Sequence, residues 1–273
     1  MIAFLKMHGL GNDFVVFDAR KQALALNAAA ASAIADRRRG IGCDQVIVIE
    51  RSKDADAAMR IFNADGGEVE SCGNAARCVA RLLMEEMDRD TVRLDTPGGM
   101  LICNDAGGGL VTVDMGAPQL GWDKVSLASA ADTDRFILDV DGTSYTAAAV
   151  SMGNPHCVLF VEDAEAAPVA SLGPRIERHP MFPKRTNVEF VSVRDRAHLR
   201  MRVWERGAGI TQACGSGACA AAVAAHRRGL TGDKVEIELD GGSLAIELRD
   251  GRVLMTGPAT LVFQGEIDLA ELA

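Results

Sequence analysis

Residues 59–73 read MRIFNADGGEVESCG, and residues 201–215 read MRVWERGAGITQACG. The two stretches align without a gap when Cys72 is laid on Cys214. The same shift carries Gly11-Asn12 onto Gly153-Asn154 and Gln45-Val46 onto Asn187-Val188, and a shift one position longer carries Gly98-Gly99 onto Gly241-Gly242. Because these matches keep one order and one spacing, they indicate an internal duplication.

Both copies are predicted to contain the same elements in the same order. Alternating strands lie at 13–18 and 157–161, and β-branched runs lie at 46–49 and 188–193. A helix is expected at 28–38, with Asn27 as its N-cap. A strongly apolar helix follows each Cys-Gly turn, at 74–87 and 216–228, and alternating strands with Gly-rich turns close each copy.

This pattern predicts an α+β fold of two pseudo-symmetric halves. Each half would be a mixed, curved β-sheet or barrel wrapped around a central helix. The seam is expected near Pro118 and Gly121, which interrupt the pattern. The N-terminal half would then comprise residues 1–118, joined by 264–273, and the C-terminal half residues 119–263.

Composition limits the class of protein. Of 273 residues, 48% are apolar and 25% are charged, which is typical of a globular protein. The formal net charge of −9 argues against nucleic acid or an anionic membrane as the main partner. No apolar run approaches the roughly 20 residues that span a bilayer, and the first 14 residues do not resemble a signal peptide. We therefore expect a cytoplasmic protein with no membrane partner.

The seven cysteines are expected to be thiols in a reducing compartment. Their number is odd, they form no CxxC pair, and the five histidines are scattered, so neither a disulfide framework nor a zinc site is predicted. Most should be small buried hydrophobic residues. This is the interpretation for Cys43, Cys78, Cys103, Cys157 and Cys219.

Cys72 and Cys214 differ because both occupy the same position between a strand and a helix. A thiol at a helix N-terminus lies near the positive end of the macrodipole, which is expected to lower its pKa from about 8.5 toward neutrality. The backbones of Gly73-Asn74 and Gly215-Ser216 would leave N–H groups open to a carboxylate. Each half would thus pair a reactive thiol with a carboxylate cradle.

Two such thiols on opposite sides of one carbon suit the inversion of an α-carbon. One group removes the α-proton, and the other returns a proton to the opposite face. N–H groups around the carboxylate would stabilise the developing carbanion-like charge. The alignment also places Glu205-Arg206 opposite Asn63-Ala64. Arg clamps carboxylates and Glu accepts from ammonium groups, so the substrate is expected to carry a second charged end.

The motifs closely resemble those of the diaminopimelate epimerase family over essentially the whole chain. The matching segments are 9–14 (GLGNDF), 44–45 (DQ), 62–66 (FNADG), 72–74 (CGN), 153–156 (GNPH), 205–209 (ERGAG) and 213–217 (ACGSG). The resemblance implies PLP-independent interconversion of LL- and meso-diaminopimelate by a homodimer, with no cofactor and no metal.

The resemblance also implies roles for individual residues. Cys72 and Cys214 would be the acid–base pair, and His156 and Glu205 would tune their pKa values. Substrate contacts would come from Asn12, Gln45, Asn63, Gly73, Asn74, Asn154, Asn187, Glu205, Arg206, Gly215 and Ser216. Gly67, Ala75 and Ile210 depart from the family's usual residues, which puts only fine substrate preference in doubt.

Four alternatives remain open at this level. The same scaffold could epimerise another diamino or basic amino acid. A thiol redox protein could cycle a Cys72–Cys214 disulfide, and a hydrolase could pair Cys214 with His156. A binding protein would need neither thiol. For individual residues, the Asn after Gly at 12 and 154 could serve only turns, and His156 could be a packing residue.

Overall fold

The computed structural model describes residues 1–22, 24–70 and 72–272, and they form two compact units. The N-terminal unit comprises Met1–Val113 with Thr256–Ala273, and the C-terminal unit comprises Asp114–Met255. In the sequence-based division, only residues 264–273 return to the first half. The structure returns the chain earlier because the strand β18 (Thr260–Ile267) pairs antiparallel with β1 (Ile2–Gly9) along its whole length.

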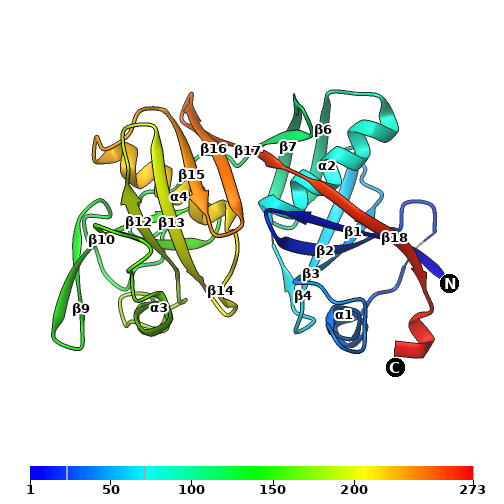
Figure 1. Cartoon of the computed structure of the whole chain (residues 1–273), viewed down its shortest axis with the longest axis horizontal. Coiled ribbons are helices and arrows are strands. Elements are labelled where there is room, and N and C mark those ends of the chain that lie inside the picture. The colour runs from blue at the N-terminus through cyan, green and yellow to red at the C-terminus, as the bar shows by residue number, and fades with distance from the viewer. Residues whose placement is uncertain (23, 71, 273) are drawn as a thin grey trace. The chain divides into compact units, whose positions relative to one another are not determined.

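The N-terminal unit is a mixed sheet with one inner and one outer helix (Figure 1). Its strands pair in the order β18-β1-β2-β3-β4-β6-β7, with β2–β3 and β4–β6 parallel and the other pairs antiparallel. Its remaining elements are β2 (Asn12–Asp18), α1 (Ala28–Ala35), β3 (Gln45–Glu50), β4 (Ala57–Asn63), β5 (Glu68–Val69), α2 (Gly73–Met87), β6 (Thr91–Thr96), β7 (Gly99–Gly107), most of β8 (Leu110–Asp114) and the 3₁₀ turn η1 (Leu269–Leu272).

The C-terminal unit repeats this order as β9-β10-β11-β12-β13-β15-β16, with β11–β12 and β13–β15 parallel. Its elements are β9 (Phe136–Val140), β10 (Thr143–Ser151), β11 (Pro155–Phe160), α3 (Val169–Glu177), β12 (Asn187–Val193), β13 (His198–Glu205), β14 (Gly209–Ile210), α4 (Gly215–Arg227), β15 (Lys234–Leu239), β16 (Gly242–Arg249) and most of β17 (Arg252–Pro258).

Strand register preserves the shift found in the sequence. Val46 pairs with Phe62 in the first unit, and their equivalents under the shift, Val188 and Trp204, pair in the second. The α+β class with a duplicated, helix-centred sheet is therefore confirmed. The four α-helices of the described residues also follow the repeat, since α3 begins within one residue of the position that the shift gives for α1.

The first half of α2 and most of α4 are buried inside their own units. Every residue of α2 from Gly73 to Ala80 is buried, as is every residue of α4 from Gly217 to Ala225. Helix α2 contacts both β1 and the distant β6 and β7, so the sheet curls around it. A helical segment that is buried on every side persists only inside such a wrapping. Burial of the helix therefore sets where its first turn lies.

The outer helices cover the other face of each sheet. In α1, Ala31 and Ile34 pack against Phe17 and Val48, and Asn27 accepts a hydrogen bond from the Ala30 N–H at 2.9 Å as the predicted N-cap. The helix ends at Ala35, three residues earlier than predicted. In the described residues, no helix has both the length and the apolar character needed to cross a membrane.

Candidate active site

Cys72 is the N-cap of α2, the position predicted from the Cys-Gly turn. Its Sγ donates to Oδ1 of Asn12, at the start of β2, over 3.8 Å. The same oxygen accepts from Nδ2 of Asn74 at 3.2 Å, and Nδ2 of Asn12 donates to Asp44 at 3.0 Å. The structure therefore brings Cys72, Asn12 and Asn74 together, with the Asn12 amide oxygen turned toward the thiol.

A charged network behind Asn12 fixes this orientation. Asp44 accepts from the Asp13 N–H at 3.1 Å, and Arg37 bonds both carboxylates. Burial raises the pKa of Asp13, but hydrogen bonds from Arg37 and Lys6 outweigh it and hold that pKa at about 2. Sequence reasoning did not identify this network, because its members come from four separate segments.

Gln45 and Asn63 form a second polar group of the N-terminal unit. They are direct cross-strand partners, and Nε2 of Gln45 donates to Oδ1 of Asn63 at 2.9 Å. Within the described part of the chain, the buried Oε1 of Gln45 has no hydrogen-bond partner. An unpaired buried acceptor of this kind is suited to an ammonium donor.

Cys214 is the N-cap of α4 and is buried, with 4% of its surface exposed. Its Sγ lies 3.7 Å from Oγ of Ser216, and that hydroxyl accepts from Nδ2 of Asn154 at 3.3 Å. Nδ1 of His156 lies 2.7 Å from Oε1 of Glu189, and Nε2 lies 2.9 Å from Oδ1 of Asn154. A polar chain therefore leads from the interior of the sheet to the thiol.

Asn187 and Arg206 contact the backbone of the C-terminal unit. Asn187 donates to the carbonyl of Pro155 at 3.0 Å and accepts from the N–H of Arg206 at 2.9 Å. The exposed Arg206 guanidinium donates to the carbonyl of Lys184 at 3.2 Å. Asn187 thus joins two loops, and Arg206 stands at the surface of its unit.

The structure corrects the expected pKa of Cys214. Burial raises it well above the ordinary value, and the negative charges of Glu205 and Glu189 raise it further. Hydrogen bonds from the Gly217 N–H and Ser216 lower it but do not compensate. A helix dipole contributes typically about 0.3–1 kcal/mol, less than the desolvation of a buried thiolate. The raised pKa favours the thiol form of Cys214, in contrast to the pKa near neutrality expected from its position at a helix N-terminus.

The carboxyl groups of Glu205 and Glu189 contribute to the raised pKa of Cys214. Burial raises the pKa of Glu205, while hydrogen bonds from Thr211 and Cys214 lower it. Burial also raises the pKa of Glu189, against the opposing charge and hydrogen bond of His156. Sequence reasoning missed Glu189. Its signal was a single charge within the apolar run of β12, NVEFVSV.

The other cysteines fit the structural interpretation. Cys43, Cys78, Cys103, Cys157 and Cys219 are all 2% exposed or less. Burial raises the pKa of Cys43 and of Cys78 to about 12. These thiols are therefore poor nucleophiles at neutral pH.

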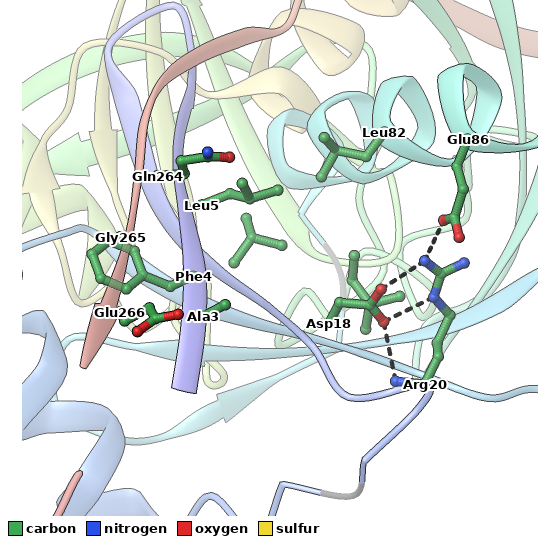
Figure 2. Close-up of a pocket in the computed structure, with 12 residues that line it drawn as sticks. Ala3, Phe4, Leu5, Asp18, Arg20, Leu82, Glu86, Gln264, Gly265 and Glu266 are labelled. Atoms are coloured by element: carbon green, nitrogen blue, oxygen red, sulfur yellow. Dashed lines mark hydrogen bonds and ion pairs between the residues drawn. The ribbon is translucent and has the colours of Figure 1, made fainter. Parts of the chain in front are cut away.

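The N-terminal unit contains a cavity of about 590 Å³ (Figure 2). Leu82 and Glu86 line it, ten and fourteen residues further along α2 than Cys72, or about 15–21 Å at 1.5 Å per residue. Arg20 in its wall is bonded by Asp18 and Glu86. The cavity is therefore separate from the thiol site.

The three family departures lie outside the thiol contacts. Ala75 is buried in the first turn of α2, and Gly67 lies in an exposed turn where its N–H donates to Asp65 at 2.8 Å. Ile210 is 42% exposed on β14. None of the three supplies a polar group to the site.

The chain matches the family model described as diaminopimelate epimerase over residues 4–121 and 148–262. A diaminopimelate epimerase from Acidiphilium cryptum (strain JF-5) is 54% identical over 99% of this chain and 98% of its own length. Another from Rhodospirillum centenum (strain ATCC 51521 / SW) is 55% identical over 97% and 91%. The chain belongs to the diaminopimelate epimerase family.

Solved structures share the fold of this family member at low sequence identity. A probable proline racemase from Agrobacterium radiobacter K84 aligns with a TM-score of 0.73 at 18% identity, over 98% of this chain and 93% of that one. A hydroxyproline epimerase from Agrobacterium vitis aligns with a TM-score of 0.67 at 16% identity, over 97% and 91%. These likenesses support the fold assignment alone.

Replacing Glu205 by Gln is expected to make Cys214 more acidic. Because the Glu205 carboxylate raises the pKa of Cys214, its removal lowers that pKa and increases the thiolate fraction at every pH below it. A fall of one unit gives about tenfold faster alkylation. The measurement is iodoacetamide labelling of Cys214 by peptide mass spectrometry across pH. Glu236→Gln, at an exposed site on β15, is the control, and equal rates in the two variants would contradict the assignment.

Proposed function

We propose that the chain interconverts LL- and meso-diaminopimelate without PLP or a metal, with Cys72 and Cys214 as the two acid–base groups. The observation that carries the proposal is the equivalence of the two cysteines. Each is the N-cap of a buried central helix at the same position of the repeat, and each has an Asn amide in its hydrogen-bond network. Membership of the family supplies the substrate.

The reaction requires one thiolate and one thiol. The raised pKa of Cys214 supports its entering as the thiol, the proton donor. Cys72 first releases to solvent the proton that it donates to Asn12 in the free protein. Its thiolate then takes the α-proton and leaves the electron pair on the α-carbon, while the Cys214 S–H gives a proton to the other face. Ser216 and the Gly217 N–H stabilise the resulting Cys214 thiolate. In the reverse direction the roles exchange, as a two-base mechanism requires.

The first turns of α2 and α4 are proposed to hold the reacting carboxylate. The leading N–H groups of a helix have no intrahelical acceptor, and Gly73, Asn74, Gly215 and Ser216 provide them here. They would stabilise the charge that moves from the α-carbon into the carboxylate. Asn12, Gln45, Asn63, Asn154, Asn187, Glu205 and Arg206 stay predicted substrate contacts, with His156 and Glu205 as pKa-tuning groups. The cytoplasmic location also stays a prediction.

Replacing either cysteine by Ala is expected to reduce epimerisation by at least about 10³-fold, because one of the two proton transfers loses its group. The measurement is formation of meso-diaminopimelate from the LL isomer by chiral chromatography, with reduced protein and no added PLP or metal. Cys103→Ala, in a buried thiol on β7, is the control and should keep activity within a few-fold.

Each competing hypothesis predicts a different result. Turnover that consumes a thiol reductant would favour the redox protein, and hydrolysis that needs Cys214 but not Cys72 would favour the hydrolase. Full activity of both Cys→Ala variants would refute the proposal. A wild type that is inactive on diaminopimelate but exchanges the α-proton of another amino acid would change only the substrate.

The homodimer expected from the family resemblance is proposed to form through β18. Leu261, Val262 and Phe263 on this strand are 46–55% exposed, and the pairing with β1 occupies one edge of the strand. The cavity of Figure 2 adjoins the same strand at Gln264–Glu266. Exposed apolar strands at a sheet edge are usually covered in native proteins, and a second copy would cover this one.

Phe263→Asp is therefore expected to shift the protein from dimer to monomer, because a charge would be buried without a partner. The measurement is molar mass by light scattering across a dilution series. Ile137→Asp, at another exposed apolar position, on β9, should leave the dimer intact. A monomeric wild type, or a dimer unaffected by Phe263→Asp, would refute the interface.

A further inference from the structure

Glu189 is a fully buried carboxyl group in the middle of β12, between Val188 and Phe190. The two-thiol reaction proposed above does not use it. Its Oε1 lies 2.7 Å from Nδ1 of His156, which is also fully buried. Within the described residues its Oε2 has no hydrogen-bond partner. An incompletely satisfied buried carboxyl group is costly and is seldom kept for stability alone.

The hydrogen bonds of His156 define how many protons the pair holds. Nε2 faces Oδ1 of Asn154, and because an amide oxygen can only accept, this arrangement requires a proton on Nε2. Nδ1 faces a carboxyl oxygen, so a further proton lies between Nδ1 and Oε1, on one atom or the other. The pair therefore holds one proton more than a neutral imidazole beside a carboxylate.

The extra proton and the orientation of the Asn154 amide require each other. With Nε2 protonated, Asn154 turns Oδ1 to His156 and Nδ2 to Oγ of Ser216, 3.3 Å away. Without it, Nε2 would be an acceptor and the amide would reverse. The Ser216 hydroxyl lies 3.7 Å from Sγ of Cys214. Because Ser216 accepts from Asn154, its own O–H is left to donate to the sulfur.

The N-terminal unit lacks this pair at the equivalent positions. Under the shift that lays Cys72 on Cys214, Phe14 corresponds to His156 and Ile47 to Glu189, and both are apolar and buried. There Asp44 accepts from Nδ2 of Asn12, so Asn12 turns its oxygen toward Cys72. The two equivalent amides thus present opposite groups, an acceptor beside Cys72 and a donor toward Ser216 and Cys214.

Packing keeps Glu189 next to the thiol. A Cβ on Gly217 would lie 2.8 Å from Oε1 of Glu189 and 3.2 Å from Sγ of Cys214, so only glycine fits between them. The titratable groups around the pair are Cys157 on β11, Glu205 on β13 and Cys214 on α4. None of them supplies a cation that would replace the proton held by His156.

We propose that Glu189 is a positioning residue for the epimerase reaction. Together with His156 it retains one proton, which keeps the Asn154 amide directed at Ser216 and the Ser216 hydroxyl directed at Cys214. The inference rests on the proposed function. The donor would stabilise the thiolate that Cys214 becomes after giving up its proton. Glu189 itself does not touch the substrate.

The first test is ¹⁵N-resolved NMR of the reduced wild-type protein at neutral pH. A protonated Nε2 and a strongly downfield Nδ1 proton shared with Glu189 are expected for His156. The shared proton should disappear in Glu189→Met, which keeps the side-chain volume without an acceptor. An unprotonated Nε2 in the wild type would overturn the proposal. The wild-type spectrum does not depend on whether any variant folds. A glutamate with only a structural role would not need to share a proton with His156.

The second test is epimerase activity of the same variants. Glu189→Met is expected to lose about 10- to 100-fold in kcat, the usual effect of losing a hydrogen bond to a charged group. Glu189→Gln, which keeps a hydrogen bond to Nδ1 without sharing a proton, should fall between that variant and the wild type. Glu236→Met on the exposed face of β15 should match the wild type. A folded Glu189→Met protein with the wild-type rate would overturn the proposal.

The wild-type rate on diaminopimelate is measured first, so that the proposed epimerase function and the proposed role of Glu189 are tested separately. An inactive wild type that shows the shared proton would refute the proposed function and not the state of the pair. An active wild type without the shared proton would refute the role of Glu189 and leave the epimerase intact.

Discussion

Burial of the central helices is the constraint on which the rest of the structure depends. Residues Gly73–Ala80 of α2 and Gly217–Ala225 of α4 are buried, and a curled sheet surrounds each of these helices. That burial fixes the first turn of each helix, and Cys72 and Cys214 are the residues that begin those turns. The reactive thiols thus stand on the most enclosed element of each unit, which suits proton transfer at a fixed carbon.

Duplication supplies a symmetric frame, and side chains then make its halves chemically different. The register of β2, β3 and β4 recurs in β11, β12 and β13, yet the polar environments of the thiols differ. A surface network of Asp44, Asp13 and Arg37 orients Asn12 beside Cys72. A buried Glu189–His156 pair orients Asn154 near Cys214. The two thiols therefore stand in different polar environments although their positions in the fold are equivalent.

Much of the fold could be predicted because it depends on patterns of residues that are close together in the sequence. The repeat, the apolar helices after each Cys-Gly turn and the Asn27 cap all depend on neighbouring residues. Long-range features could not be predicted. The return of β18 to β1 joins opposite ends of the chain, and the Glu189–His156 contact depends on the pairing of two strands. The raised pKa of Cys214 was missed because desolvation depends on packing that a motif does not contain.

The central claim is that two separate thiols transfer the two protons, and the order of deuterium incorporation tests it most directly. LL-diaminopimelate is incubated with reduced protein in deuterated water, and α-deuterium is measured in both isomers at low conversion. Two bases predict that the meso product carries solvent deuterium from the start while the remaining LL substrate stays unlabelled, because the returning proton comes from a thiol already exchanged with solvent. Product that retains the substrate's own α-hydrogen would show that a single group carries the proton across, which would contradict the account.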